Sequence, residues 1–218
     1  MKSLARIGEF RFLLTNFICF GTIMKSKVVF HSGGAIGADT AFLKNSLNSP
    51  LDVFTIIHSF SGHKPVILKN QENFKVKIHY DLAEANESVR KASIFLKRRI
   101  PSEDYSKNLI RRNYFQIRDS ELVFAVAPLE TDRTVSGGTG WAIAMAVERQ
   151  IPVFVFDDLN SYDWFYFSYF KKSFQFWRNN LPLDFLSFKV EKGFSTFTGI
   201  GTRKLSLRGN EEIRRIFT

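Results

Sequence analysis

Two glycine-rich segments follow apolar runs in this chain, and their residue types are those that hold phosphate groups. The first segment covers residues 31–40, and the second covers residues 136–142. Their glycines are Gly33, Gly34, Gly37, Gly137, Gly138 and Gly140. Glycine permits positive φ angles and close approach of a ligand, and a helix that starts there offers unpaired N–H groups at the positive end of its dipole. Each segment therefore predicts an anion site, most often for phosphate.

A third segment, residues 198–203, contains Gly199 and Gly201 and is predicted to form another turn between a strand and a helix. The carboxyl ends of parallel strands meet at one edge of a sheet, where ligands bind. Three such turns predict one shared cleft for a nucleotide-like ligand. The first segment lacks the G-x-G-x-x-G spacing of dinucleotide-binding proteins. Turns with a purely structural role are the alternative.

Polar side chains near these glycines extend the predicted site. Asp39 falls in the first turn of a predicted helix, where it either compensates the helix dipole or accepts a hydrogen bond from a ribose hydroxyl. Four arginines either form a solvated face or bind phosphate in forked geometry: Arg98, Arg99, Arg111 and Arg112. The predicted ligand-binding residues are Ser32, Gly33, Gly34, Gly37, Asp39, Thr40, Arg98, Arg99, Arg112, Asn113, Ser136, Gly137, Gly138, Thr139, Gly140, Gly199, Gly201, Thr202 and Arg203.

Two further residues have both a structural and a functional interpretation. Trp141 either fills the core, which we favour, or stacks on a base. His31 ends its predicted strand, where it is either structural or a hydrogen-bond donor. The four histidines of the chain show no metal-ligand spacing, so we predict no metal site.

Predicted strands and helices alternate along the chain, which indicates an α/β fold: a Rossmann-like parallel sheet with helices on both faces. The strands are expected at 27–31, 53–58, 75–80, 121–127, 152–157 and 194–197, and the helices at 38–48, 82–96, 102–118, 141–147 and 206–216. Residues 141–147 are apolar on nearly every side, so this helix should pack inside the fold. The aromatic-rich stretch 162–178 is expected as a small addition towards the C-terminus, either a strand pair or a flap.

The composition limits the class of protein. The chain has 218 residues, 44% of them hydrophobic, and a net charge of +10, so it can bury one core and favours polyanionic partners. Its single cysteine, Cys19, excludes an intrachain disulfide and favours a cytoplasmic location. Residues 1–24 begin like a signal peptide, but polar residues interrupt their apolar run and no small-residue cleavage site follows. We expect an N-terminal extension over 1–24, with export as the alternative, and one domain over 25–218 without a membrane span.

The three glycine segments resemble those of the SLOG superfamily. That group includes the DNA-processing A (Smf) proteins, the lonely-guy phosphoribohydrolases, YpsA-type proteins and molybdenum-cofactor carriers, and this chain is most similar to phage-associated members. The resemblance covers about residues 27–216, includes the stretch 109–114, and implies a Rossmann-like nucleotide-binding domain. The lonely-guy enzymes use P-G-G-x-G-T-x-x-E, whose glutamate carries the glycosidic chemistry. Ser136, Trp141 and Ala144 here replace the proline, the threonine and the glutamate.

Three functions are therefore expected, in order. The first is a protein that senses, carries or sequesters a nucleotide-derived or other phosphorylated small molecule, such as an ADP-ribose derivative, without a further cofactor. The second is a hydrolase of an N-glycosidic or phosphate bond, in which Asp39 or Asp157 would act by a mechanism other than that of the lonely-guy enzymes. The third is a binder of single-stranded nucleic acid through the aromatic and basic side chains of residues 164–178. A homo-oligomer is compatible with each of them.

Overall fold

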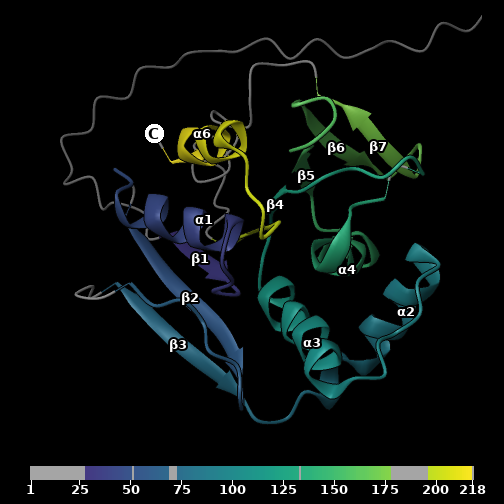
Figure 1. Ribbon diagram of the computed structural model, residues 1–218, viewed down its shortest axis with the longest axis horizontal. Helices are drawn as coiled ribbons and strands as arrows, with labels where there is room; N and C mark the ends of the chain where they lie inside the picture. Colours follow the sequence, from purple (N-terminus) through teal and green to yellow (C-terminus); the bar gives the residue numbers. More distant parts are fainter. Residues whose placement is uncertain (1–27, 51, 69–72, 133, 178–195, 218) are drawn as a thin grey trace, which may run out of the picture.

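One eight-stranded sheet organises the molecule. The computed structural model describes residues 28–50, 52–68, 73–132, 134–177 and 196–217. The strands lie in the order β3-β2-β1-β8-β4-β5-β6-β7 (Figure 1). Their bounds are β1 Val28–Ser32, β2 Val53–Phe60, β3 Phe74–His79, β4 Val123–Val126, β5 Val153–Phe156, β6 Trp164–Ser168, β7 Ser173–Phe176 and β8 Thr196–Gly201. Residues 1–24, expected as an extension, lie outside the described residues.

The six strands from β3 to β5 are parallel, and β6 and β7 are added antiparallel. Of the two alternatives for the aromatic-rich stretch, the strand pair is confirmed by β6 and β7. The chain runs from β1 towards one edge of the sheet and from β4 towards the other, and β8 fills the position between them. This reversal of direction is where open α/β sheets leave room for a ligand.

Helices cover both faces of the sheet, which confirms the predicted α/β fold class. Figure 1 shows α1 and α6 together on one side and α2, α3 and α4 on the other. The helix bounds are α1 Ala38–Leu47, the 3₁₀ helix η1 Ala83–Ala85, α2 Asn86–Leu96, α3 Asp104–Arg118, α4 Gly137–Glu148 and α6 Leu207–Ile216. As expected, α4 is an inner helix, which packs on α2, α3, β4 and β5. No helix in the described part of the chain is long and apolar enough to cross a membrane.

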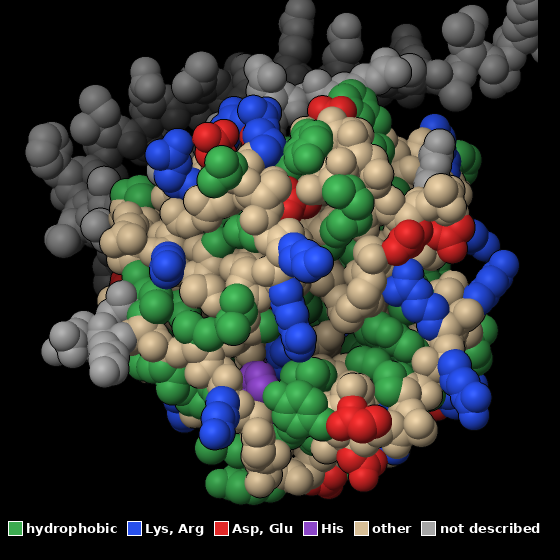
Figure 2. All heavy atoms as spheres, viewed as in Figure 1, with side chains coloured by type: hydrophobic (Ala, Val, Ile, Leu, Met, Phe, Trp, Pro, Cys, Tyr) green, Lys and Arg blue, Asp and Glu red, His purple; other side chains and the backbone are tan. Residues whose placement is uncertain are grey.

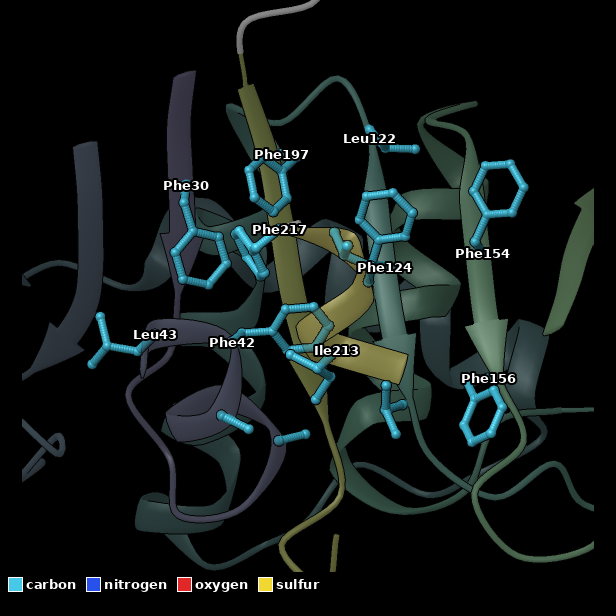
Figure 3. Packing of buried hydrophobic residues seen from close by; sticks show 14 of the residues in the cluster. Phe30, Phe42, Leu43, Leu122, Phe124, Phe154, Phe156, Phe197, Ile213 and Phe217 are labelled. Atoms are coloured by element: carbon cyan, nitrogen blue, oxygen red, sulfur yellow. The ribbon is translucent and has the colours of Figure 1, made fainter. Parts of the chain in front are cut away.

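Phenylalanine fills the core on the α1 and α6 face. Phe30, Phe197 and Phe124 lie side by side on the neighbouring strands β1, β8 and β4 (Figure 3). The ring centroids of Phe30 and Phe197 are 5.1 Å apart, and those of Phe124 and Phe197 are 6.1 Å apart. Phe42 of α1 and Phe217 after α6 cover them. These contacts hold β8 between β1 and β4, at the centre of the sheet.

The third predicted glycine turn is wrong, because Gly199 and Gly201 lie inside strand β8. A Cβ on Gly199 would lie 2.4 Å from the ring of Phe42, and one on Gly201 would lie 2.1 Å from the carbonyl oxygen of Val126. These glycines let α1 and β4 pack closely against β8. Residues 194 and 195 of the expected strand lie outside the described residues.

Gly201→Ala is expected to lower the free energy of unfolding by about 1–3 kcal/mol, because the added methyl group meets a backbone oxygen that cannot move aside. Urea denaturation measures the change. Gly138→Ala is the matched control, since a Cβ there meets nothing within 4 Å. Equal stability of the two variants would contradict the close packing of β8 on β4.

Candidate ligand-binding site

A cleft of about 790 Å³ opens at the carboxyl ends of β1, β8 and β4. It is lined by the first glycine segment, by the start of α4 and by the residues that follow β8. The space-filling view shows a hollow in the middle of this face, bordered by Lys and Arg side chains and by hydrophobic side chains (Figure 2). Its volume is in the range of small-molecule sites. The expected shared cleft is therefore present, although its third wall comes from the end of a strand.

Three backbone N–H groups of the first glycine segment already form hydrogen bonds within the protein. Gly34 N–H donates to Ser32 Oγ at 3.1 Å, and Ala35 N–H donates to Asp39 Oδ2 at 3.4 Å. Ala38 N–H, in the first turn of α1, donates to the carbonyl oxygen of Thr202 at 2.9 Å. These three donors are not free for a ligand, and a carboxylate lies among them. The first segment is therefore a weaker anion site than its sequence predicts.

Asp39 connects the first segment to the end of β8. Its Oδ1 accepts a hydrogen bond from Gly201 N–H at 3.2 Å, and its side chain is 2% exposed. Burial raises the pKa of this carboxyl, against the opposing effects of Arg112 and of the backbone N–H groups of Ala35, Gly201 and Gly33. Asp39 also lines the cleft. The structure accounts for it as a link between segments, and its contact with a ribose stays a prediction.

Arg112 lies beneath the first segment, so of its two alternatives the solvated face is wrong. Its side chain is 5% exposed, and its Nη1 lies 3.9 Å from Asp39 Oδ2. Nη1 also donates to Gln116 Oε1 at 3.0 Å, and Gln116 in turn donates to the carbonyl oxygen of Gly199. Burial lowers the pKa of Arg112, while Asp39 opposes this shift. The buried Nε has no hydrogen-bond partner among the described residues.

Gly33 makes room for that guanidinium. A Cβ on Gly33 would lie 1.2 Å from Nη1 of Arg112, so a side chain there would displace the cation. The sequence predicted that Gly33 lets a ligand approach the backbone. In the structure, the group that approaches is Arg112 of α3, which lines the cleft itself.

The second glycine segment presents the first turn of α4 to the cleft. Ser136 is the N-cap residue of α4, with φ −68° and ψ 157°, and its side chain makes no capping hydrogen bond. The N–H groups of Gly137, Gly138 and Thr139 have no hydrogen-bond partner among the described residues. A Cβ on Gly137 or Gly138 would meet nothing within 4 Å. This helix start therefore faces open space, as an anion site requires.

Two side chains fix the peptide groups of this turn from behind. Arg98 Nη1 donates to the carbonyl oxygen of Gly137 at 3.3 Å, and its Nη2 donates to Thr134 Oγ1. Asn113 Nδ2 donates to the carbonyl oxygen of Gly138 at 3.2 Å. Both side chains bind carbonyl oxygens. Since the N–H and C=O groups of a helix point in opposite directions along its axis, the N–H groups of this turn point away from Arg98 and Asn113.

The structure brings most of the predicted residues together at the cleft. The lining contains Gly34, Asp39, Arg112, Asn113, Ser136, Gly137, Gly138, Thr139, Gly201, Thr202 and Arg203. The predicted residues outside this lining are Ser32, Gly33, Gly37, Thr40, Arg98, Arg99, Gly140 and Gly199. Gly37 and Thr40 instead line a separate hollow of about 380 Å³ beside α1, and Thr40 Oγ1 donates to the carbonyl oxygen of Ala35. Trp141 is buried, as favoured, and also lines the cleft.

Several lining residues were missed. His63 and Lys64 come from the loop after β2, and Tyr105 and Leu109 come from the first turns of α3. The loop after β2 reaches the cleft because Val66 N–H donates to the carbonyl oxygen of Gly34 at 2.8 Å. A signal for this loop was present, since any loop after a parallel strand starts at the same edge of the sheet as the glycine segments.

His31 belongs to a buried chain of three histidines that crosses β1, β2 and β3. His31 Nδ1 lies 2.9 Å from His58 Nε2, and His58 Nδ1 lies 3.0 Å from His79 Nε2. His79 stacks on Phe115 of α3, with ring centroids 3.9 Å apart. Burial lowers the pKa of His31 and of His79 to about 4 and that of His58 to about 2. The three imidazole rings are therefore uncharged at pH 7.

Comparisons with protein-family models, with curated proteins and with solved structures find no match to this chain. The similarity of its glycine segments to the SLOG superfamily therefore stays a prediction, and the site is interpreted from its own geometry.

Proposed function

We propose that this protein binds a phosphorylated, nucleotide-derived small molecule in the cleft, with the phosphate at the N-terminus of α4. The observation that carries the proposal is the open first turn of α4. Its N–H groups, which have no partner in the described part of the chain, and the dipole of a twelve-residue helix favour an anion there. The first glycine segment then serves as a wall of the cleft, since the N–H groups of Gly34, Ala35 and Ala38 already have partners and the carboxylate of Asp39 lies among them.

The charges of the cleft favour the same kind of ligand. Lys64, Arg112 and Arg203 line it, and Asp39 is the one carboxylate among the described lining residues. Asp39 is buried beside Arg112, which reduces its repulsion of an anion. A forked guanidinium such as that of Arg112 is well suited to phosphate oxygens.

Fewer observations support the hydrolase alternative. Ala144, at the position of the lonely-guy glutamate, is buried in an apolar cluster with Trp141 and Met145. Glu148, one turn further along α4, forms an ion pair with Lys91 at 2.6 Å. Asp157 holds the loop after β5 by accepting hydrogen bonds from the backbone N–H groups of residues 129 and 159–161. Asp39 is left as the carboxylate to test, by incubating the protein with nucleotides and separating the products by chromatography.

Gly138→Val is expected to weaken the binding of a nucleoside monophosphate at least about 10-fold while the fold stays intact. A Cβ at this position meets nothing within 4 Å, so the new side chain would extend into the open space in front of the α4 turn. Isothermal titration with a panel of nucleotides, ADP-ribose and inorganic phosphate measures the affinity. Glu87→Val, in the exposed first turn of α2, is the control and should bind like the unchanged protein. If none of these ligands binds the unchanged protein at millimolar concentration, the proposed function is wrong.

A further inference from the structure

One wall of the cleft carries an aromatic group that the phosphate site does not use. Tyr105 and His63 both line the cleft, and both rings contact Phe60. The ring of His63 lies 5.2 Å from that of Phe60 at 12°, and the ring of Tyr105 lies 5.7 Å from it at 58°. Phe60 is 4% exposed and Tyr105 is 45% exposed. We name these three residues the aromatic shelf.

The shelf is held in place from behind. Phe60 belongs to the apolar cluster that packs α3 and α4 together, with Ile110 and Trp141 among its members. Ser59 Oγ lies 3.0 Å from His63 Nδ1 and fixes the orientation of the imidazole. Burial, together with Arg112, lowers the pKa of His63 to about 4, so its ring is uncharged at pH 7. Two flat, uncharged rings are thus presented to the cleft.

The aromatic shelf and the first turn of α4 meet α3 at different points along its axis. Tyr105 is in the first turn of α3, and Asn113, eight residues later, contacts Gly138. Eight residues of α-helix correspond to about 12 Å. A nucleoside mono- or diphosphate can span that separation from base to terminal phosphate, whereas inorganic phosphate or a small sugar phosphate cannot. The apolar side chains of Ile36 and Leu109 also line the cleft, as a base-binding region requires.

We propose that the aromatic shelf is a stacking site for the base of the ligand, and that the cleft therefore selects nucleoside phosphates with an intact base over sugar phosphates. This inference rests on the proposed phosphate site at α4, because the two sites together set the length of the ligand. Tyr105 supplies the exposed ring for stacking, and Phe60 supports it. Stacking on an aromatic side chain is tolerant of base identity, so all four common bases should benefit.

Isothermal titration with three kinds of probe tests the shelf: the four nucleoside 5′-monophosphates, the matching nucleosides, and ribose 5-phosphate. The monophosphates should bind the unchanged protein about 5- to 150-fold more tightly than ribose 5-phosphate. Tyr105→Ala should remove this difference and leave the affinity for ribose 5-phosphate unchanged. Tyr105→Phe keeps the ring and should bind like the unchanged protein. Tyr80→Ala is the control, because Tyr80 is 85% exposed and does not line the cleft.

The outcomes separate the shelf from the phosphate site. If the monophosphates bind no better than ribose 5-phosphate, or if Tyr105→Ala keeps the difference, the shelf proposal is overturned while the phosphate site stands. If nucleosides bind in a Tyr105-dependent way but ribose 5-phosphate does not bind, the shelf stands and the phosphate site fails. If no probe binds at millimolar concentration, both proposals are overturned.

Discussion

Arg112→Met is expected to lower the free energy of unfolding by about 3–5 kcal/mol, because it removes one partner of a buried charge pair and leaves the other. The variant leaves the buried carboxylate of Asp39 without its cation and Gln116 Oε1 without the donor Nη1. Urea denaturation at pH 7 measures the loss. Arg111→Met is the matched control on the same helix, because Arg111 is partly exposed and contacts Asn108. Its expected change is within about 0.5 kcal/mol.

A second substitution shows whether the stability lost in Arg112→Met comes from the uncompensated charge of Asp39. Asp39→Asn combined with Arg112→Met removes both charges, so the double variant should recover part of the stability that Arg112→Met loses. The loss in Arg112→Met should also shrink at lower pH, since the carboxyl of Asp39, with its raised pKa, can take up a proton. Equal stability of Arg112→Met and Arg111→Met would show that the buried pair does not stabilise the fold.

The protein is expected to lose stability steeply between pH 7 and pH 5 because of its histidine chain. The pKa values of His31, His58 and His79 lie well below the ordinary value of 6.5. Below pH 6.5 the unfolded chain binds protons that the folded protein does not bind. Each such histidine then costs about 1.4 kcal/mol of stability per pH unit. The stability that depends on neutral histidines is complete above pH 6.5 and declines as the pH falls towards 4.

The two hydrogen bonds that join the three histidines also predict that the folded protein takes up fewer protons than the unfolded chain. Each of these two hydrogen bonds contains one proton. Three neutral rings carry three protons, so two of them form the hydrogen bonds and the third lies on an outer nitrogen of one of the two terminal rings. One added proton occupies the other end, whereas a second added proton would place two N–H groups against each other. Charged neighbours modify this balance: Lys77, Arg118 and Arg112 disfavour a further positive charge, and Asp119 and Glu84 favour it. Asp39 acts in the opposite sense, since its raised pKa favours the folded state as the pH falls.

His58→Gln tests the histidine chain. Glutamine keeps a donor and an acceptor at the middle position but does not titrate. The slope of unfolding free energy against pH should then fall by about one quarter, because the lowered pKa of His63 also contributes to it. Urea denaturation at pH 7, 6 and 5 gives the slope for the unchanged protein and the variant. A slope near zero in the unchanged protein would contradict the proposed neutrality of the chain. The slope, unlike the stability itself, does not depend on any packing lost by the substitution.

The elements that follow from local pattern were predictable. The spacing of Leu82, Ala85, Val89, Ala92 and Leu96 predicts one buried helical face, and all five are buried. The uniformly apolar residues 141–147 predict an inner helix, and α4 is one. Gly33 and Gly34 directly follow β1, and Gly137 and Gly138 begin α4 after the loop that follows β4. A chain that turns from strand to helix favours such residues at these places. Periodicity and turn chemistry depend on neighbours in the chain, so the sequence carries them directly.

Contacts between distant residues were decided only in three dimensions. Asp39 and Gly201 are 162 positions apart, and their hydrogen bond exists because β8 inserts between β1 and β4. The same insertion makes Gly199 and Gly201 close-packing positions of a strand and not a turn. Arg112 belongs to a basic run that indicates a solvated helix face, yet its guanidinium is buried against Gly33, where the absence of a side chain leaves room for it. The parallel register places Ile56 opposite His31 and Lys77 opposite His58. Each next histidine is two positions further along its strand, so the three rings meet diagonally across the sheet, which no local spacing reveals. The sequence by itself determined the elements and the edge of the sheet where a ligand could bind. The tertiary structure decided which N–H groups stay free there, because only packing shows which donors the protein has already used.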